Sequence, residues 1–401
     1  MRNLFDAAVA AADPMRVVPP NLPDPPTGRT VVIAAGKAAA AMARAVEDHW
    51  DGPISGIAVT RYGHGVNCDF VDVVEADHPM PDSAGQDAAM RVRDLAAGLT
   101  EDDLALFLIS GGGSALLAAP ADGITLADKQ AVTRALLAGG APISDINSVR
   151  KHLSAVKGGR LAALAAPARV ATLIISDVPG DDPATVASGP SIADPTTLED
   201  ARAVLEKFRI TPPDAVAALL NRAESETPKS VPGADTRIIA SSRDALNAAA
   251  GAARAAGVDA AILGDDLEGE ARDLAREHAR LARGHAPGLL LSGGEVTVTL
   301  GDTVGKGGPN AEYALALAIA LDGAVDIHAI ACDSDGIDGE GDAAGALIAP
   351  DTLSRAATAD IDPRALLDHH DSYTFFSKLD DHVITGPTRT NVNDFRAILI
   401  H

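Results

Sequence analysis

One run of five residues, Ser110-Gly111-Gly112-Gly113-Ser114, has the composition of a phosphate-binding loop. Its consecutive glycines leave backbone N–H groups uncovered by side chains, and a phosphate group needs such access to approach the backbone closely. The run lacks the G-x-x-x-x-G-K-[ST] spacing of a Walker A loop. It therefore predicts an anion-binding loop, with an ordinary tight turn as the alternative.

A second candidate is the lysine of Gly36-Lys37, which stands between an apolar run and an alanine-rich one. The glycine permits a turn with positive φ, and Lys37 would then lie at a helix N-terminus beside unpaired backbone N–H groups. A cation there opposes the helix dipole, so its presence favours a role in binding an anion. The alternative is a lysine that faces solvent.

The segment 147–160 concentrates basic residues in an otherwise acidic chain. Helical spacing brings Arg150 close to Lys157, and arginine binds carboxylates and phosphates in a bidentate manner. We therefore expect Arg150 or Lys151 to bind a carboxylate, and we assign Asn147 and Lys157 to the same site. A solvated helix face is the alternative.

Aspartates follow two other apolar runs and are the predicted metal ligands. Asp177 comes directly after one run, and Asp333 and Asp335 come after another. Mg²⁺ prefers one or two carboxylates together with substrate phosphates and water. For the crowded segment 333–342 the alternative is a solvated acidic loop.

Two further polar segments complete the set of candidate ligands. Ser292-Gly293-Gly294-Glu295 follows an apolar run and is predicted to be a glycine-rich loop like the first segment. The segment 385–394 concentrates hydroxyls, amides and one arginine. It contributes Thr388 as a candidate ligand and Arg389 as a candidate catalytic cation.

The composition excludes several classes of partner. The 401 residues include 33 basic and 56 acidic side chains, for a net charge of −23. Such a field repels nucleic acids and anionic lipids, so we expect neither nucleic-acid nor membrane binding, and an anion site must be locally positive. Cys68 and Cys332 form no CxxC pair, which argues against a disulfide framework. With no secretory signal and no apolar run of about 18 residues, a cytoplasmic location is expected.

We expect these residues to be positioned by strands, which are predicted from apolar runs in the sequence. Five of them each precede a short polar segment, namely Val31–Ala34, Leu104–Ile109, Val170–Ile175, Leu289–Leu291 and Ile327–Ala331. Helices are expected between them, for example over Ala38–Trp50 and Leu198–Asn221. In open α/β sheets, ligands bind outside the carboxyl ends of the strands, so the five polar segments are expected to line a shared site.

The polar stretch Arg222–Ala234 is the expected domain boundary, which divides the chain into 1–232 and 233–401. The second part is expected to hold a mixed sheet. Its predicted additional strands are Val296–Leu300, Thr374–Phe376, His382–Ile384 and Phe395–Ile400.

In this order, the motifs resemble those of the class II glycerate 2-kinase family, the glycerate kinases with a C-terminal MOFRL domain. The resemblance spans nearly the whole chain. It rests on AAGKAAAAMA, EADHPMPDSAG, FLISGGGSALLAAP, NSVRKHLSAVKGGRLA, LIISDVPGDDPATVASGP, LLSGGEVTVTL, ACDSDGIDG and TGPTRTNVND.

The resemblance implies an α/β protein with a larger Rossmann-like N-terminal domain, a smaller α/β C-terminal domain and an active site in the cleft between them. It implies transfer of a phosphoryl group from ATP to the 2-hydroxyl of D-glycerate, with a divalent metal such as Mg²⁺. Lys37 matches the family's active-site lysine. We expect Lys37 to contact the transferred phosphate, and the resemblance leaves a homodimer open.

The chain departs from the family at one position. Where the family often has GGRNQE, this sequence has Gly307-Gly308-Pro309-Asn310-Ala311-Glu312. Asn310 stays a candidate ligand, but Pro309 supplies neither charge nor a backbone N–H. Lys306, Arg389 or Arg150 would have to replace the arginine, unless that arginine is dispensable. Two other functions remain open: a hydroxypyruvate reductase, as family members have been labelled, and a ligand-binding protein without turnover.

Overall fold

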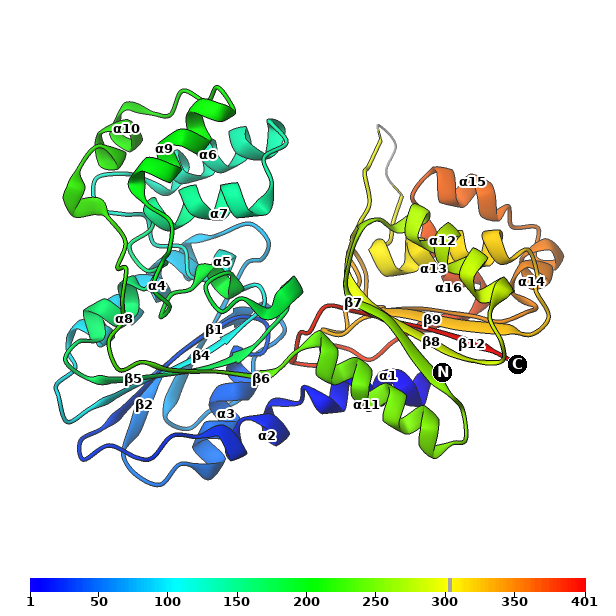
Figure 1. Ribbon diagram of the computed structural model, residues 1–401, viewed down its shortest axis with the longest axis horizontal. Coiled ribbons are helices and arrows are strands. Elements are labelled where there is room, and N and C mark those ends of the chain that lie inside the picture. Colours follow the sequence, from blue (N-terminus) through cyan, green and yellow to red (C-terminus); the bar gives the residue numbers. More distant parts are fainter. Residues whose placement is uncertain (302–304) are drawn as a thin grey trace. The chain divides into compact units, whose positions relative to one another are not determined.

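The computed structural model describes residues 1–301 and 305–401. The chain forms two compact units, shown in Figure 1. The N-terminal unit comprises Val17–Ser176 and Asp181–Ile239, and the C-terminal unit comprises Met1–Arg16, Asp177–Gly180 and Ala240–His401. The boundary expected between residues 232 and 233 stays a prediction. These units differ from it chiefly in the two short segments that belong to the C-terminal unit.

The centre of the N-terminal unit is a six-stranded sheet with the order β3-β2-β1-β4-β5-β6. Its strands are β1 (Thr30–Ala35), β2 (Ile54–Arg61), β3 (Val71–Ala76), β4 (Leu104–Ser110), β5 (Arg169–Ile175) and β6 (Asp235–Ala240). The pairs β1–β2, β1–β4, β2–β3 and β4–β5 are parallel. Every residue of β1 and β4 is buried, as is typical of parallel strands that are covered on both faces. The predicted Rossmann-like parallel sheet is confirmed.

Helices of the N-terminal unit pack on this sheet and on one another. Helix α3 (Ala39–His49) contacts β1, β2 and β4, and α4 (Ser83–Ala97) contacts β2 and β3. A separate cluster with its own apolar core, grouped above the sheet in Figure 1, consists of α6 (Leu126–Ala138), α7 (Ile143–His152), α9 (Leu198–Lys207) and α10 (Asp214–Leu220). The shorter helices of this unit are α5 (Gly113–Leu116) and α8 (Arg160–Ala165); α2 (Pro14–Val17) is shared, with Pro14–Arg16 in the C-terminal unit and Val17 in this one.

The C-terminal unit contains a second six-stranded sheet, with the order β11-β10-β9-β12-β8-β7. Its strands are β7 (Ala260–Glu270), β8 (Gly288–Thr297), β9 (Ile327–Asp333), β10 (Gly345–Ile348), β11 (His382–Val383) and β12 (Asp394–Ile400). Strands β7 and β8 are parallel, and the other pairs are antiparallel. The predicted mixed sheet is therefore confirmed.

Helices cover both faces of this second sheet (Figure 1). One face carries α12 (Ala271–Gly284), α13 (Pro309–Leu321), α14 (Thr352–Thr358), α15 (Pro363–Asp368) and α16 (Ser372–Leu379). On the other face, α1 (Arg2–Ala11) packs against α11 (Ser242–Ala255), and both contact β12. Over residues 1–301 and 305–401, the chain has no helix with the length and apolar character needed to cross a membrane.

Two predicted strands and one predicted helix differ from the structure. Thr374–Phe376 lies inside α16 and not in a strand, because Ser372, Phe375, Phe376 and Leu379 form a buried stripe with helical spacing. The predicted strand Val296–Leu300 is the continuation of β8, which ends at Thr297.

The helical segment expected over Leu198–Asn221 is two helices, α9 and α10. The interruption contains Pro212 and Pro213, which cannot donate a helical N–H bond.

The residue that follows β1 must be glycine, because a side chain there would clash with the end of β4. Gly36 has φ 130°, and a Cβ added there would lie 2.2 Å from Ser110 Oγ. We predict that Gly36→Ala lowers the free energy of unfolding of the N-terminal unit by about 1–3 kcal/mol, because the alanine combines a strained φ with a clash.

The matched control is Gly251→Ala in helix α11, where an added Cβ meets no atom within 4 Å. There the change should raise stability by up to about 1 kcal/mol, since alanine is the better helix former. Calorimetry of the full chain measures both variants, and equal effects would contradict the steric role of Gly36.

Candidate active site

The loops that follow β1 and β4 lie side by side at the point where the strand order of the N-terminal sheet reverses. The chain runs from β1 outward to β2 and β3 and then returns to β4 on the other side of β1. The backbone N–H of Lys37 donates to the Gly111 carbonyl at 2.8 Å. The N–H of Ala38 donates to Ser110 Oγ at 3.0 Å. The fold thus brings together Lys37 and the Ser110–Ser114 segment, at the position where open α/β sheets bind ligands.

The glycines of the second loop permit this contact. Gly112 has φ 81°, and a Cβ there would lie 3.2 Å from the His78 ring and 3.3 Å from Lys37 Cγ. A Cβ on Gly113 would lie 2.8 Å from the Ala187 Cβ. The lysine side chain therefore runs past a loop that offers backbone without side chains.

Two of the predicted basic ligands converge on Ser114, the last residue of this loop. An Arg150 Nη donates to Ser114 Oγ at 2.8 Å. Lys157 Nζ donates to the Ser114 carbonyl at 2.8 Å and to the Leu117 carbonyl at 3.2 Å. Ser188 Oγ lies 2.9 Å from Ser114 Oγ. The predicted phosphate-binding loop and part of the predicted basic segment thus share one site.

A third cation in this region, Lys129 of helix α6, was missed by sequence reasoning. Burial, together with the charge of Arg150, lowers the pKa of Lys129 to about 7. Burial, with the charges of Lys129 and Arg150, also places the pKa of Lys157 well below its usual value. The sequence did contain a signal, because Lys129 occupies the same buried helix face as Val132 and Leu136.

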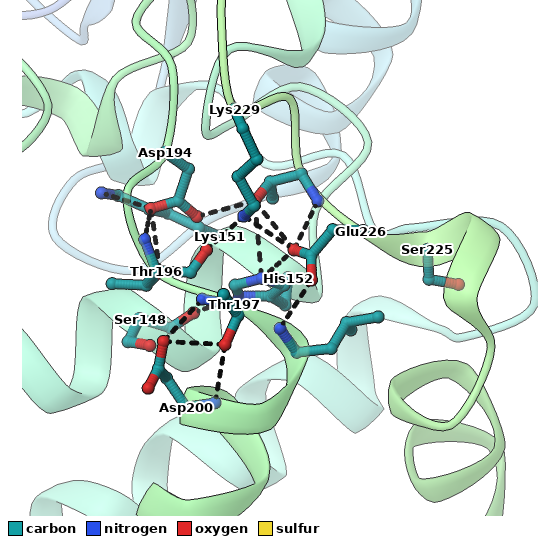
Figure 2. A network of polar contacts seen from close by, with 12 residues as sticks. Ser148, Lys151, His152, Asp194, Thr196, Thr197, Asp200, Ser225, Glu226 and Lys229 are labelled. Atoms are coloured by element: carbon teal, nitrogen blue, oxygen red, sulfur yellow. Dashed lines mark hydrogen bonds and ion pairs between the residues drawn. The ribbon is translucent and has the colours of Figure 1, made fainter.

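Lys151, the neighbour of Arg150 on helix α7, points into a different network, shown in Figure 2. Its Nζ lies 3.3 Å from Asp194 Oδ1, and both side chains are buried. His152 Nε2 lies 2.9 Å from a Glu226 carboxylate oxygen. Lys151 therefore has a carboxylate partner within the protein, and its assignment as a substrate ligand stays a prediction.

Glu226 connects this network to its surroundings. Burial raises the pKa of its carboxyl, but hydrogen bonds from the Leu198 N–H, Lys229 and His152 outweigh burial and hold the pKa below the usual range. Glu226 also borders a cavity of about 580 Å³ that is lined in addition by Arg93, Arg160 and Arg222. None of the predicted site residues lines that cavity. Asn147 is half-buried on helix α7.

In the C-terminal unit, three segments far apart in sequence meet around Asp177. The Asn391 amide donates to Asp177 Oδ2 at 3.1 Å. The amide of Asn393 donates to the Asp177 backbone carbonyl. The Thr388 N–H donates to the Asp335 carbonyl at 2.9 Å. The predicted metal ligand Asp177, the acidic turn and the 385–394 segment are thus neighbours.

The predicted metal ligands do not form a preorganised coordination site. Asp333 Oδ1 accepts the Asp335 N–H at 2.9 Å, and Asp335 Oδ1 accepts the Ile337 N–H at 2.8 Å. In the described part of the chain, no group of three or more His, Cys, Asp or Glu side chains is arranged to hold a metal ion. Carboxylate oxygen is the donor type that Mg²⁺ prefers, and Mg²⁺ needs only one or two carboxylates when phosphates and water complete its shell. The chemistry of Asp177, Asp333 and Asp335 therefore fits Mg²⁺, and their role stays a prediction.

Asn310 is held in a buried polar network. Its backbone N–H donates to Asp338 at 3.0 Å, and its amide donates to Asp394 Oδ1 at 2.6 Å. Burial raises the pKa of Asp338 to about 7, against the hydrogen bonds from Ala311 and Asn310. Pro309 is the first residue of helix α13, a position at which proline is favoured because no N–H is needed.

The Ser292–Glu295 segment is not a loop, and this prediction was wrong. It lies within strand β8, with Ser292, Gly293 and Gly294 buried and Glu295 exposed. A Cβ on Gly294 would lie 2.2 Å from the Leu267 carbonyl. The glycines permit a close approach of β7 to β8 at an irregular register. Whether these residues bind a ligand stays a prediction.

The three cations proposed to replace the family arginine have different surroundings. Lys306 Nζ lies 3.8 Å from the centroid of the Tyr373 ring. Arg150 contacts Ser114, as described above. Arg389 is exposed and has φ 62°, in the left-handed region.

Comparisons with known proteins agree with the fold and with the motifs. Residues 1–221 match a domain of unknown function, DUF4147, and residues 288–394 match the MOFRL family. A "Putative hydroxypyruvate reductase" of Agrobacterium vitis is 55% identical, over 100% of this chain and 94% of that protein. The "Glycerate 2-kinase" of Pyrococcus horikoshii is 40% identical, over 91% of this chain and 86% of its own. The crystal structure of a glycerate kinase from Thermotoga maritima superimposes with a TM-score of 0.90 at 38% identity, covering 100% of this chain and 98% of that one.

The Lys151–Asp194 ion pair is expected to stabilise the N-terminal unit. We predict that Lys151→Met lowers the free energy of unfolding by about 3–5 kcal/mol, because it leaves the Asp194 carboxylate buried and unpaired. The double variant Lys151→Met/Asp194→Asn should recover part of that loss in denaturant titrations.

Lys229→Met is the control, because Lys229 forms a more exposed ion pair with Glu226 in the same network. Its effect should be at most about 1 kcal/mol. A large loss in Lys151→Met that the second substitution does not reduce would contradict the role of the pair.

Proposed function

Because this chain belongs to the glycerate kinase family that combines DUF4147 with MOFRL, we propose that it transfers a phosphoryl group from ATP to the 2-hydroxyl of D-glycerate. The product would be 2-phosphoglycerate, and Mg²⁺ would assist. The observation that carries the proposal is the contact of Lys37 with the glycine-rich loop after β4. The names of the Pyrococcus and Thermotoga relatives support the choice of glycerate and of kinase activity.

Phosphoryl transfer mainly requires positioning and neutralisation of charge, because its transition state is loose. In the proposed mechanism the Lys37 ammonium binds the transferred phosphoryl group. Backbone N–H groups of Ser110–Ser114 bind an anionic oxygen of the nucleotide or the acid, and Arg150 binds the carboxylate of D-glycerate. When bound by Asp177, Asp333 or Asp335, Mg²⁺ would neutralise phosphate charge. No strong general base is required by a loose transition state.

A second candidate is an NAD(P)H-dependent reduction of hydroxypyruvate, which the name of the Agrobacterium relative favours. The strand order β3-β2-β1-β4-β5-β6 is also the one found in dinucleotide-binding domains. Against it, the turn after β1 lacks the G-x-G-x-x-G pattern, and β2 ends at Arg61 where an NAD-binding domain has an acidic residue. An arginine there is compatible with NADPH, so both cofactors belong in the test.

The decisive activity experiment compares three reactions of the purified full chain. Coupled ADP release with D-glycerate, ATP and Mg²⁺ should show turnover, and phosphorus NMR should identify 2-phosphoglycerate. NADH or NADPH absorbance with hydroxypyruvate should stay constant. Oxidation of either nicotinamide without ADP release would overturn the proposal in favour of the reductase, and binding of D-glycerate without any turnover would indicate a binding protein.

Lys37→Ala is predicted to lower kcat about a hundredfold to a thousandfold, because a preorganised cation at the transferred phosphate acts mainly on the transition state. The control is Lys378→Ala, since Lys378 is an exposed lysine of helix α16. The coupled assay should give wild-type kcat for the control. Near-wild-type kcat in Lys37→Ala would remove this lysine from the mechanism.

Arg389→Ala tests whether Arg389 supplies the charge that Pro309 cannot. We predict a decrease of kcat of about tenfold to a hundredfold, with partial recovery in Arg389→Lys, because the charge is retained there but the bidentate geometry is lost. The same assay measures both variants. Unchanged kcat in Arg389→Ala would leave Lys306 and Arg150 as the candidates.

A further inference from the structure

Two cations, Arg150 and Lys157, contact the glycine-rich loop of the N-terminal unit, and a third, Lys129, lies on a neighbouring helix and interacts electrostatically with them. Lys129 lies on helix α6, Arg150 on helix α7, and Lys157 between α7 and α8. Lys129 is only 7% exposed and Lys157 only 1%. Helices α6 and α7 contact each other and are neighbours in the upper helical cluster of Figure 1. Lysine is almost never buried to this extent without a partner of opposite charge.

Within the described part of the chain, the hydrogen bonds of Arg150 and Lys157 go to neutral oxygens only. Arg150 and Lys157 donate to the hydroxyl and carbonyl oxygens of Ser114 and to the carbonyl of Leu117. Among residues 1–301 and 305–401, no carboxylate forms an ion pair with either of them or with Lys129. Lys151, on the same helix as Arg150, does have such a partner in Asp194. The cluster therefore differs from the other buried lysine of this region.

The acidic residue next to Lys129 in the sequence does not neutralise it. Asp128 Oδ2 accepts hydrogen bonds from the Thr125 N–H and Oγ1, at 2.8 and 2.7 Å, and so caps the start of helix α6. The charge of Arg150 acts on Lys129, and Lys129 and Arg150 in turn act on Lys157; all three groups are cations. Buried charge without a counter-charge is unfavourable by several kcal/mol, and a bound anion removes that cost.

We infer that Lys129, Arg150 and Lys157 form a binding subsite for an anionic group of the reactants, a carboxylate or a phosphate, with Lys129 as a direct ligand. The subsite adjoins the candidate active site because two of its cations are bonded to Ser114 of the glycine-rich loop. The identity of the ligand rests on the proposed function. The existence of the subsite rests on the uncompensated charge alone.

The state of Lys129 should depend on pH in the neutral range. Its pKa is lowered to about 7 from the ordinary 10.5. In the empty protein Lys129 is therefore charged below about pH 7 and neutral above it, whereas the unfolded chain keeps the charge up to about 10.5. Burial of the charge lowers stability fully below pH 7, and the loss disappears as pH rises toward 10.5. A bound anion should raise this pKa again.

The test is thermal unfolding of the full chain at pH 6.5, alone and with D-glycerate, hydroxypyruvate, ATP with Mg²⁺, or inorganic phosphate. Lys129→Met should raise the Tm of the empty protein, because it removes an unpaired buried charge. It should also abolish most of the Tm increase caused by at least one of the anions. Lys229→Met is the matched control, because Lys229 forms a more exposed ion pair with Glu226 and belongs to none of the candidate ligands; it should change Tm little and keep the increase caused by the anions. Stabilisation of the wild type by D-glycerate or hydroxypyruvate assigns a carboxylate, and stabilisation by ATP or phosphate assigns a phosphate.

Binding titrations at several pH values give a second readout that needs no turnover. The Kd of the stabilising anion should rise about tenfold to a hundredfold in Lys129→Met, as expected for the loss of a charged hydrogen bond. Wild-type affinity should fall as pH rises above 7, and Lys129→Arg should remove that dependence. If Lys129→Met does not fold, Lys129→Gln replaces it.

An anion-induced Tm increase and a Kd that are unchanged in the neutral variants would overturn the subsite. So would a wild type that none of the four anions stabilises. Because binding and Tm are measured without catalysis, a protein that binds through Lys129 but forms no ADP would contradict the proposed function and leave the subsite intact.

Discussion

The close approach of the chain at the ends of β1 and β4 is the constraint on which the candidate site depends. The Lys37 N–H donates to the Gly111 carbonyl, and no side chain fits at position 36, where a Cβ would meet Ser110. This contact requires two adjacent parallel strands of matched length, and these in turn require a sheet buried on both faces. The site is therefore a product of the sheet topology, which gives the lysine and the glycine-rich loop a fixed separation.

Much of this arrangement could be predicted from the sequence, because it follows from strand ends. Apolar runs followed by polar residues identified β1, β4, β5 and β9, and the parallel sheet places the ends of the first three at one edge. The Ser292–Glu295 segment misled the same reasoning. Its glycines serve a close contact between two strands, and composition alone does not distinguish that need from a turn.

The fine assignment of the cations could not be predicted, because it depends on helix orientation. Arg150 and Lys151 are adjacent in sequence, but successive residues of a helix point about 100° apart. One reaches Ser114 and the other reaches Asp194. For Lys129 the sequence carries a signal of burial, its place on an apolar helix face, but which charged groups it faces depends on the partner helices. In a chain of net charge −23, the placement of a few buried cations determines where an anion can bind.

The C-terminal unit is assembled from segments that are far apart in sequence and are therefore synthesised at very different times. Helix α1 precedes every other described element in sequence, yet its packing partners are α11 and β12. Strand β12 follows every other strand in the sequence, yet it lies inside the sheet between β9 and β8. During synthesis the sheet therefore cannot be completed until β12 emerges from the ribosome. Until then the edges of β8 and β9 are unpaired, and α1 lacks one of its two packing partners. This unit cannot complete its fold progressively as the chain grows, whereas strands β1 to β5 of the other sheet can pair in the order in which they are made, once each neighbour has emerged.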